Sequence, residues 1–345
     1  MKFQIDTARP IDIISMGRVA VDLYADQIGV GLRNVTSFSK YLGGCAGNIA
    51  VGCARQGLKA AMFSCVGTDE MGQYIKQVLL EEKVDTQLLQ ETNQHLTGLV
   101  LLGISPPDHF PLIFYRENCA DMQLKPKHVN AAYIAKSKSL LITGTGLSTE
   151  SMFITTQYTV DVARMQNTKV IIDLDYRPVL WKLTDVGNGE DRYKVSSMVS
   201  EQYAKILPKC DLIVGTEEEI CIAGNSESIS NALYNIRQLT TAPIVMKKGA
   251  QGCTVYLTDL SHQITATPFP VKILNVLGAG DGFVSGFLRG LLRNESWEMC
   301  AKFGNASGAI LVTKHGCAPA MPTHAEMQDF IKTYEDGGNV RVSNS

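Results

Sequence analysis

The sequence contains no closely spaced pair of cysteines. Its nine cysteines are odd in number and scattered along the chain. The lack of a Cys-x-x-Cys pair argues against a zinc site, and the odd count argues against a disulfide framework. We therefore interpret the cysteines as reduced thiols in a protein core.

The chain also lacks a large excess of charge, a basic stripe and a long apolar run. Its 32 lysines and arginines nearly balance its 34 aspartates and glutamates, which leaves a net charge of -2. We therefore expect no nucleic acid and no membrane as a partner, and we expect a small-molecule ligand instead. Because no apolar run reaches membrane length and the polar N-terminus lacks the features of a secretory signal, the sequence predicts a cytoplasmic protein.

What the chain does contain is a regular alternation of strand-like and helix-like segments. At 345 residues, 45% of them hydrophobic, it has enough apolar material for one large α/β domain or two smaller ones. The alternation predicts an α/β fold in which helices flank a doubly wound, mostly parallel sheet. The expected strands are 11–16, 60–66, 139–143, 169–174, 212–215 and 244–247, and the expected helices are 47–56, 71–82, 151–165, 282–294 and 297–313.

Two segments interrupt this alternation, at about residues 19–39 and 95–118. Both are rich in strand-forming residues, and in the second the triplet Pro106-Pro107-Asp108 separates two apolar runs, which indicates a hairpin. We expect these segments to form a small β-sheet lid on a single domain at 1–335, followed by a tail at 336–345. Such a lid would exclude water from a reaction beneath it.

The most informative motif is Gly278-Ala279-Gly280-Asp281, which precedes the amphipathic helix expected at 282–294. Backbone amides at a helix N-terminus attract phosphate oxygens, and the small residues leave their approach open. The same field would keep Asp281 ionised, so that it can accept the proton of a hydroxyl that attacks phosphorus. The alternative is a flexible strand-to-helix connection with Asp281 as an ordinary N-cap.

A second glycine-rich motif, Gly43-Gly44-Cys45-Ala46-Gly47-Asn48, lies early in the chain. The two motifs in this order resemble the two signatures of the ribokinase-like (phosphofructokinase-B) sugar kinases, and the resemblance extends from residue 13 to about residue 330. It implies a ribokinase-like fold and a carbohydrate kinase that uses ATP and Mg2+. In such an enzyme Asp281 would be the catalytic base, and Gly278, Ala279 and Gly280 would form the turn that binds the transferred phosphoryl group.

Within the family, the segments 38–44, 115–121, 173–181 and 320–323 are most similar to kinases of a keto-deoxy sugar acid in myo-inositol catabolism. The similarity implies ATP-dependent phosphorylation of the C6 hydroxyl of that acid. A 2-keto-3-deoxygluconate kinase or another sugar kinase is an alternative. A non-catalytic sugar-acid sensor is an alternative of a different class, since a fold does not fix function.

A sugar acid carries a carboxylate, which a planar guanidinium is well shaped to bind. Arg116 follows the last apolar run of the second lid segment, and it matches an arginine that contacts the substrate acid in related kinases. We therefore expect Arg116 to bind the substrate carboxylate. An ion pair with Glu117 or Asp121 is the alternative.

Arg177 follows the strand expected at 169–174, at whose carboxyl end an open α/β sheet binds ligands. We expect it to neutralise charge on the transferred phosphoryl group, because such neutralisation is most of what an enzyme can contribute to a loose transition state. A local ion pair with Asp173 or Asp175 is the alternative.

The resemblance also implies roles for the early part of the chain. Asp22 and Asn48 would hydrogen-bond sugar hydroxyls, and Gly43 and Gly44 would let the backbone approach the sugar closely. Asp22 or Asn48 could instead cap a turn or a helix, and the glycines could form a plain tight turn. Ala20 replaces an asparagine of the family pattern, as expected for a sugar other than ribose.

For the nucleotide, the resemblance points to residues on several separate segments. Glu219 would hold Mg2+ through water, because hydrated magnesium needs only one or two protein carboxylates. The run 217–219 could instead be the solvated first turn of a helix. The expected ATP-binding residues are Thr216, Glu219, Gly249, Gly252, Gly278, Gly280 and Asn305.

Asn275-Val276 replaces the family's usual Asp-Thr before the second motif, so dependence on a monovalent cation is left open. Exposed lid strands invite edge pairing, and we therefore expect a homodimer formed through the lid.

Overall fold

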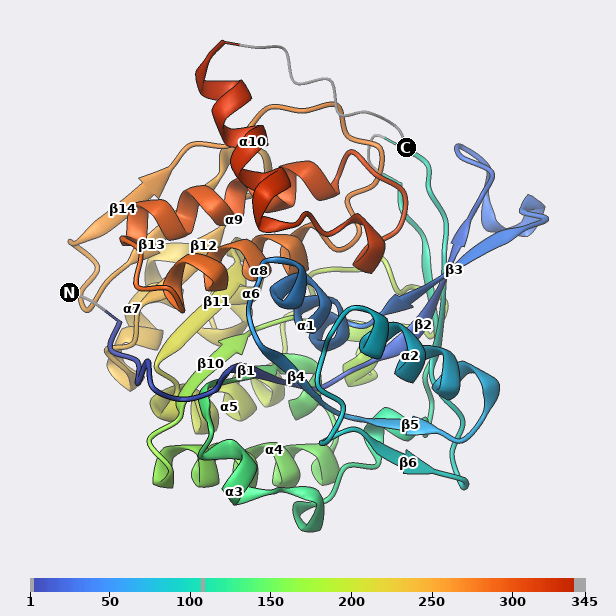
Figure 1. Ribbon diagram of the computed structural model, residues 1–345, viewed down its shortest axis with the longest axis horizontal. Helices are drawn as coiled ribbons and strands as arrows, with labels where there is room; N and C mark the ends of the chain where they lie inside the picture. The colour runs from blue at the N-terminus through green and yellow to red at the C-terminus, as the bar shows by residue number, and fades with distance from the viewer. Residues whose placement is uncertain (1–2, 107–108, 338–345) are drawn as a thin grey trace.

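The computed structural model describes residues 3–106 and 109–337 of the chain. Its centre is an eight-stranded sheet with the order β14-β13-β12-β11-β10-β9-β1-β4 (Figure 1). Neighbouring strands from β12 to β4 are parallel, whereas β13 and β14 are antiparallel additions at one edge. The strands of this sheet are β1 (Ile11–Met16), β4 (Ala60–Phe63), β9 (Ser137–Thr143), β10 (Lys169–Asp173), β11 (Leu212–Thr216), β12 (Ile244–Lys247), β13 (Cys253–Tyr256) and β14 (Gln263–Ala266).

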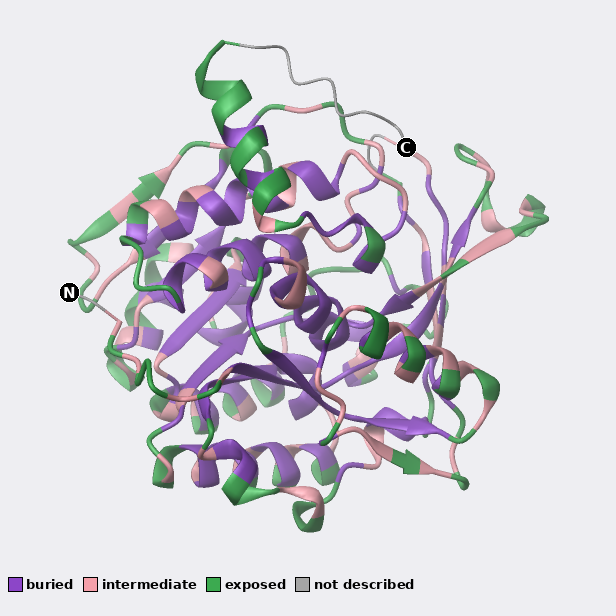
Figure 2. Cartoon of the chain, in the orientation of Figure 1, coloured by how far each residue is buried: buried purple, intermediate pink, exposed green. Residues whose placement is uncertain are grey.

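Helices cover both faces of the sheet because successive strand residues are apolar on both sides. Ile14 and Ile172 belong to a core with α4 to α7, while Ile13 and Ile171 belong to a second core with α1, α8 and α9. The central strands are buried along their length (Figure 2). The α-helices are α1 (Cys45–Arg55), α2 (Glu70–Glu81), α3 (Ala131–Ile134), α4 (Glu150–Met165), α5 (Ser197–Ile206), α6 (Glu217–Ala223), α7 (Ile229–Leu239), α8 (Ala279–Leu291), α9 (Trp297–Leu311) and α10 (His324–Glu335).

A separate four-stranded sheet with the order β3-β2-β7-β8 forms the predicted lid. β7 and β8 make the expected antiparallel hairpin, although Pro107 and Asp108 of its turn lie outside the described residues. The first lid segment extends past residue 39 to the end of β3, where the chain enters α1. The lid strands are β2 (Ala20–Ala25), β3 (Phe38–Gly43), β7 (Leu99–Leu102) and β8 (Leu112–Tyr115).

Three expectations about the elements need correction. Residues 60–66 form two strands, because β4 stops pairing where β1 ends, and β5 (Cys65–Gly67) turns away to pair with β6 (Gln90–Thr92). The strands β13 and β14 were not expected, and each has only four residues. Finally, α8 begins at Ala279 rather than at residue 282.

The described residues contain no helix long and apolar enough to cross a bilayer. Near the C-terminus, α10 ends at Glu335, and residues 338–345 of the expected tail lie outside the described residues.

Candidate active site

The Gly278–Asp281 motif forms the N-terminal turn of α8. Gly278 is the N-cap and has a φ of +83°, and a Cβ atom there would lie 2.1 Å from the sulfur of Cys317. Only glycine therefore fits this position. Among the described residues, the amides of Gly280 and Asp281 have no hydrogen-bond acceptor, so they can bind an anion. Asp281 is the third residue of the helix, not its N-cap and not a residue before it, which corrects the boundary expected from the sequence.

Asp281 is held in place by Asn48 on α1, whose Nδ2 donates a hydrogen bond of 2.7 Å to Oδ2 of Asp281. The sequence predicted that the helix field keeps Asp281 ionised. Burial and the nearby Asp175 carboxylate instead raise the pKa of Asp281 above its usual value, against the lowering effect of the Asn48 hydrogen bond. A raised pKa makes this carboxylate a stronger base once it is ionised.

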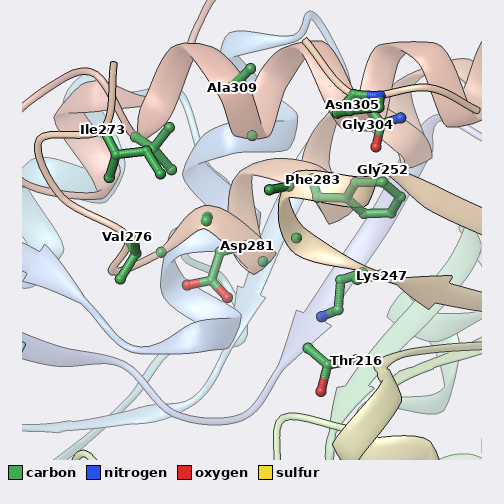
Figure 3. A pocket seen from close by; sticks show the side chains of 18 of the residues that line it. Thr216, Lys247, Gly252, Ile273, Val276, Asp281, Phe283, Gly304, Asn305 and Ala309 are labelled. Atoms are coloured by element: carbon green, nitrogen blue, oxygen red, sulfur yellow. The ribbon is translucent and has the colours of Figure 1, made fainter. Parts of the chain in front are cut away.

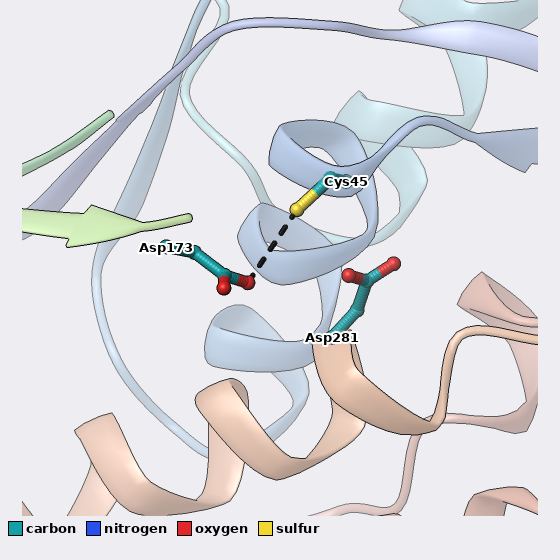
Figure 4. Close-up of side chains that lie close together, drawn as sticks. All are labelled: Cys45, Asp173 and Asp281. Carbon is teal, nitrogen blue, oxygen red and sulfur yellow. Dashed lines mark hydrogen bonds between the residues drawn. The ribbon is translucent and has the colours of Figure 1, made fainter. Parts of the chain in front are cut away.

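Cys45 and Asp173 complete a cluster around Asp281 (Figure 4). Potential ligand atoms of the three residues all lie within 4.8 Å of one another. The Cys45 thiol donates to Oδ2 of Asp173 at 3.7 Å, and burial raises the pKa of Cys45 well above its usual value. Cys45 is therefore a neutral hydrogen-bond donor rather than a thiolate.

Lys247, at the end of β12, is a buried cation beside the anion-binding turn. Its Nζ lies 3.0 Å from Oδ1 of Asp173 and 3.9 Å from Oε2 of Glu219, and a Cβ on Gly280 would lie 3.3 Å from it. Burial alone would lower the pKa of Lys247, but these two carboxylates raise it, so the ammonium stays charged. Lys247 belongs to no motif and was not expected from the sequence. Its only signal there is a lysine at the carboxyl end of a buried strand.

A cavity of about 620 Å³ opens at this turn (Figure 3). Its walls include apolar residues such as Ile273, Val276 and Ala309, which suit a flat aromatic base, and its floor contains the α8 N-terminus. The structure thus brings together every residue expected to bind ATP. These lining residues are Thr216, Glu219, Gly249, Gly252, Gly278, Gly280 and Asn305.

Several of these residues also support the walls of the cavity. Thr216 and Glu219 form a capping box at the start of α6, in which Oε2 of Glu219 accepts from the Thr216 amide at 2.7 Å. Glu219 is buried, whereas Glu217 and Glu218 are exposed. The alternative that residues 217–219 form a solvated first turn of a helix therefore holds for the first two glutamates and not for Glu219. Asn305 donates to the carbonyls of Ala266 and Thr267 at 3.1 and 2.9 Å.

A smaller cavity of about 50 Å³ lies between the lid and α8, and it shares Arg177, Arg192, Gly278 and Asp281 with the larger one. Asp281 therefore faces both cavities. Arg192 comes from the 185–193 connection, where no motif had indicated a functional residue. The other residues that line this cavity are Arg18, Asp22, Tyr24, Gly44, Asn48, Val100, Leu102, Leu112, Phe114 and Leu277.

The early glycines allow this cavity to form. A Cβ on Gly43 would lie 1.9 Å from Cγ of Asp22, and a Cβ on Gly44, whose φ is +91°, would lie 2.6 Å from the Arg18 carbonyl. Gly43 thus makes room for Asp22 and does not itself line the cavity. Oδ1 of Asp22 and Oδ1 of Asn48 are buried without a partner in the described part of the chain, as expected for acceptors that await a ligand.

The two predicted arginines have different positions. Arg177 lines both cavities and, within residues 3–106 and 109–337, forms no ion pair with Asp173 or Asp175. Arg116 is buried and pairs with Asp121, with nitrogen-to-oxygen distances of 2.7 and 2.6 Å. The ion pair with Asp121 is the alternative to the expected role of Arg116 in binding the substrate carboxylate. Arg116 lines neither cavity.

Asn275, which replaces the aspartate of the family's usual Asp-Thr pair, is fully buried. Its Oδ1 accepts a hydrogen bond of 3.0 Å from the amide of Leu277, so its side chain braces the turn that leads into α8.

Comparison with known proteins relates this geometry to a family. Residues 11–324 match the profile described as pfkB family carbohydrate kinase. The chain is 32% identical to a 5-dehydro-2-deoxygluconokinase of Geobacillus kaustophilus, over 97% of this chain and 98% of that protein. It is 34% identical to 5-dehydro-2-deoxygluconokinase 1 of Bacillus cereus, over 95% of this chain and 97% of that protein.

Among solved structures, the fold is similar to that of an Escherichia coli protein provisionally named ribokinase II, in complex with ATP and Mg2+. The TM-score is 0.82 at 19% identity, over 93% of this chain and 99% of the other. At this identity the similarity supports the fold.

Proposed function

The chain belongs to the pfkB family of carbohydrate kinases, and we propose that it transfers a phosphoryl group from ATP to the C6 hydroxyl of 5-dehydro-2-deoxy-D-gluconate in myo-inositol catabolism. The observation that carries the proposal is the position of Asp281, which faces both cavities at the anion-binding turn of α8. The choice of acceptor is supported by the 5-dehydro-2-deoxygluconokinases at 32 and 34% identity.

Each group in the site has a chemical task in this reaction. The amides of Gly280 and Asp281, which have no acceptor among the described residues, would stabilise negative charge on the transferred phosphoryl group together with the ammonium of Lys247. Asp281 would take the proton from the attacking hydroxyl, and Arg177, which lines both cavities, would neutralise charge between donor and acceptor.

The donor set of the larger cavity fits a magnesium ion. Asp173, Asp175 and Glu219 line it with hard carboxylate oxygens, and magnesium on a nucleotide keeps most of its waters. We propose that Glu219 holds the ion through water. Magnesium would offset charge on the ATP phosphates.

We further propose a homodimer formed through the lid, whose sheet has β3 and β8 at its edges. The nine free, buried cysteines suit a reducing compartment, and the proposal places the reaction in the cytoplasm. We also propose that residues 1–335 act as one kinase unit with its lid.

The test is ADP release by the purified protein with Mg-ATP and four acceptors in parallel: 5-dehydro-2-deoxygluconate, 2-keto-3-deoxygluconate, ribose and fructose. We expect the largest kcat/KM with the first. A larger value with the second would keep the mechanism and reject the assigned acceptor. ATP binding without turnover on any of the four would favour the sugar-acid sensor. The same assay with and without potassium measures the monovalent cation dependence.

A further inference from the structure

Arg18 is a buried arginine that lines the smaller cavity and forms no salt bridge with any residue that the structure describes. Its side chain is 8% exposed, and its Nε is buried without a partner. In the part of the chain that the structure describes, the guanidinium donates no hydrogen bond and lies in no ion pair. A buried charge is costly unless it is paired, so an unpaired one in a cavity indicates an anionic ligand.

The surroundings keep this cation charged and in place. Burial would lower the pKa of Arg18, but the carboxylates of Asp175 and Asp22 raise it above its usual value. Its Cζ lies over the Phe114 ring of β8, 5.4 Å from the ring centre, so a side chain of the lid sheet flanks the guanidinium.

The other orphaned atoms in the same cavity are acceptors. Oδ1 of Asp22 and Oδ1 of Asn48 are buried without a partner in the described residues, as is Nε of Arg18. One unpaired cation beside two unpaired acceptors matches a ligand that carries both an acid group and hydroxyl groups.

The three arginines of the cavity are not equivalent. Arg177 and Arg192 line the larger cavity as well, so they face the phosphates, whereas Arg18 lines the smaller cavity alone. Arg116 is neutralised by Asp121 outside both cavities. Of the three, Arg18 is thus the one that lines only the smaller cavity.

We infer that Arg18 binds the carboxylate of the sugar-acid acceptor and selects acids over neutral sugars. The inference rests on the proposed function, because it names the group that recognises the acid end of the acceptor whose hydroxyl end meets Asp281. Arg18 is a specificity-determining residue and takes no part in proton transfer.

The experiment compares Arg18→Gln and Arg18→Lys with the wild type, on the sugar acid and on fructose, a neutral ketose. We expect Arg18→Gln to raise KM for the acid at least about 30-fold, the range seen when one partner of a buried charge pair is removed. KM for ATP should change less than threefold, and kcat/KM for fructose should fall much less than kcat/KM for the acid, because fructose has no carboxylate to lose its partner. Arg18→Lys should give an intermediate KM, because lysine keeps the positive charge and loses the planar pair of donors.

The matched control is Arg33→Gln, at an exposed arginine of the lid that lines neither cavity.

Thermal unfolding without ligands separates binding from structure. Among the described residues Arg18 has no ion pair, and its removal takes away only the longer-range attraction of Asp175 and Asp22, so we expect the melting temperature of Arg18→Gln to lie close to that of the wild type. An unchanged KM for the acid in Arg18→Gln would overturn the inference and leave the proposed function intact. Wild-type activity on 2-keto-3-deoxygluconate alone would overturn the assigned acceptor, and Arg18 could then be tested on that acid. Activity on neutral sugars only would overturn both.

Discussion

Asp281 experiences opposing influences at the helix N-terminus. The helix field and Asn48 favour its ionised form, whereas burial and Asp175 favour the neutral form and dominate. The result is a carboxylate whose proton affinity is closer to that of a hydroxyl losing its proton in the transition state, as a general base requires.

We therefore expect Asp281→Asn and Asp281→Ala to lower kcat by at least about a hundredfold while nucleotide binding is retained. Single-turnover assays with Mg-ATP, paired with titration of ATP by calorimetry, would measure the two effects separately. Near-normal turnover in both variants would reject Asp281 as the base.

Asp22 predicts how acceptor binding depends on pH. Burial raises its pKa to about 7, against the lowering effect of Arg18. A protonated Asp22 has less capacity to accept hydrogen bonds, so kcat/KM for the acceptor, measured at saturating ATP, should fall as the pH decreases below about 7. In Asp22→Asn the decrease of kcat/KM at acidic pH should be weaker, and the highest kcat/KM across the pH range should be lower. A flat profile between about pH 5.5 and 8 in the wild type would contradict the assignment.

At the residue scale, a motif or family pattern pointed to residues that the fold brings together. Asp281 and Asn48 belong to the two glycine-rich motifs, Asp22 matches an acidic residue of the family pattern, and the structure places all three around the smaller cavity. Arg18 and Lys247 belong to no motif. Their importance comes from burial and from partners on other segments, which the order of residues along the chain does not show.

At the scale of elements, the first turn of α8 can be tested without disturbing the fold. A Cβ on Gly280 would meet only the flexible end of Lys247, at 3.3 Å. Alanine is also the better helix former by up to about 1 kcal/mol. We expect Gly280→Ala to keep or raise the melting temperature and to lower kcat/KM for ATP by about tenfold or more, a loss of about 1.4 kcal/mol, because the methyl group covers the anion-binding amides.

The matched control is Gly31→Ala in the lid, where φ is -63° and no atom lies within 4 Å of the added Cβ. That change should leave both stability and kcat/KM close to wild type. Equal activity in Gly280→Ala and Gly31→Ala would show that phosphate does not approach the amides of α8.

The long periodic elements could be predicted from the sequence, and the short ones could not. β1 and β12 have the predicted bounds, and α4 differs by one residue at its start, since each has a strong apolar pattern. β13 and β14 have too few residues to show a period, and the split between β4 and β5 depends on which partner strand each one meets.

At the scale of the whole molecule, the lid determines the predicted assembly. Tyr115 on the edge strand β8 is 57% exposed, an aromatic side chain at the outer edge of the lid sheet. We expect light scattering during size exclusion to give twice the chain mass of 37.6 kDa. Tyr115→Lys should shift the protein toward the monomer, whereas Met165→Lys, at the exposed end of α4, should not. A wild-type monomer at micromolar concentration would reject the lid dimer.

The layered architecture followed from the alternation of elements, but the relation between the cavities did not. The sequence indicated two separate signatures, and only the folded chain shows that Asp281 lines both cavities at once. That arrangement depends on the hydrogen bond between Asn48 and Asp281, which joins residues 233 positions apart.

The connection between β3 and α1 has a mechanical consequence. β3 passes through Gly44 directly into α1, and Asn48, one helical turn later, holds the carboxylate of Asp281. A tilt of the lid would therefore be transmitted along the backbone to Asn48 and, through its hydrogen bond, to the proposed base. The binding of a sugar beneath the lid could in this way also orient the carboxylate that is proposed to take its proton.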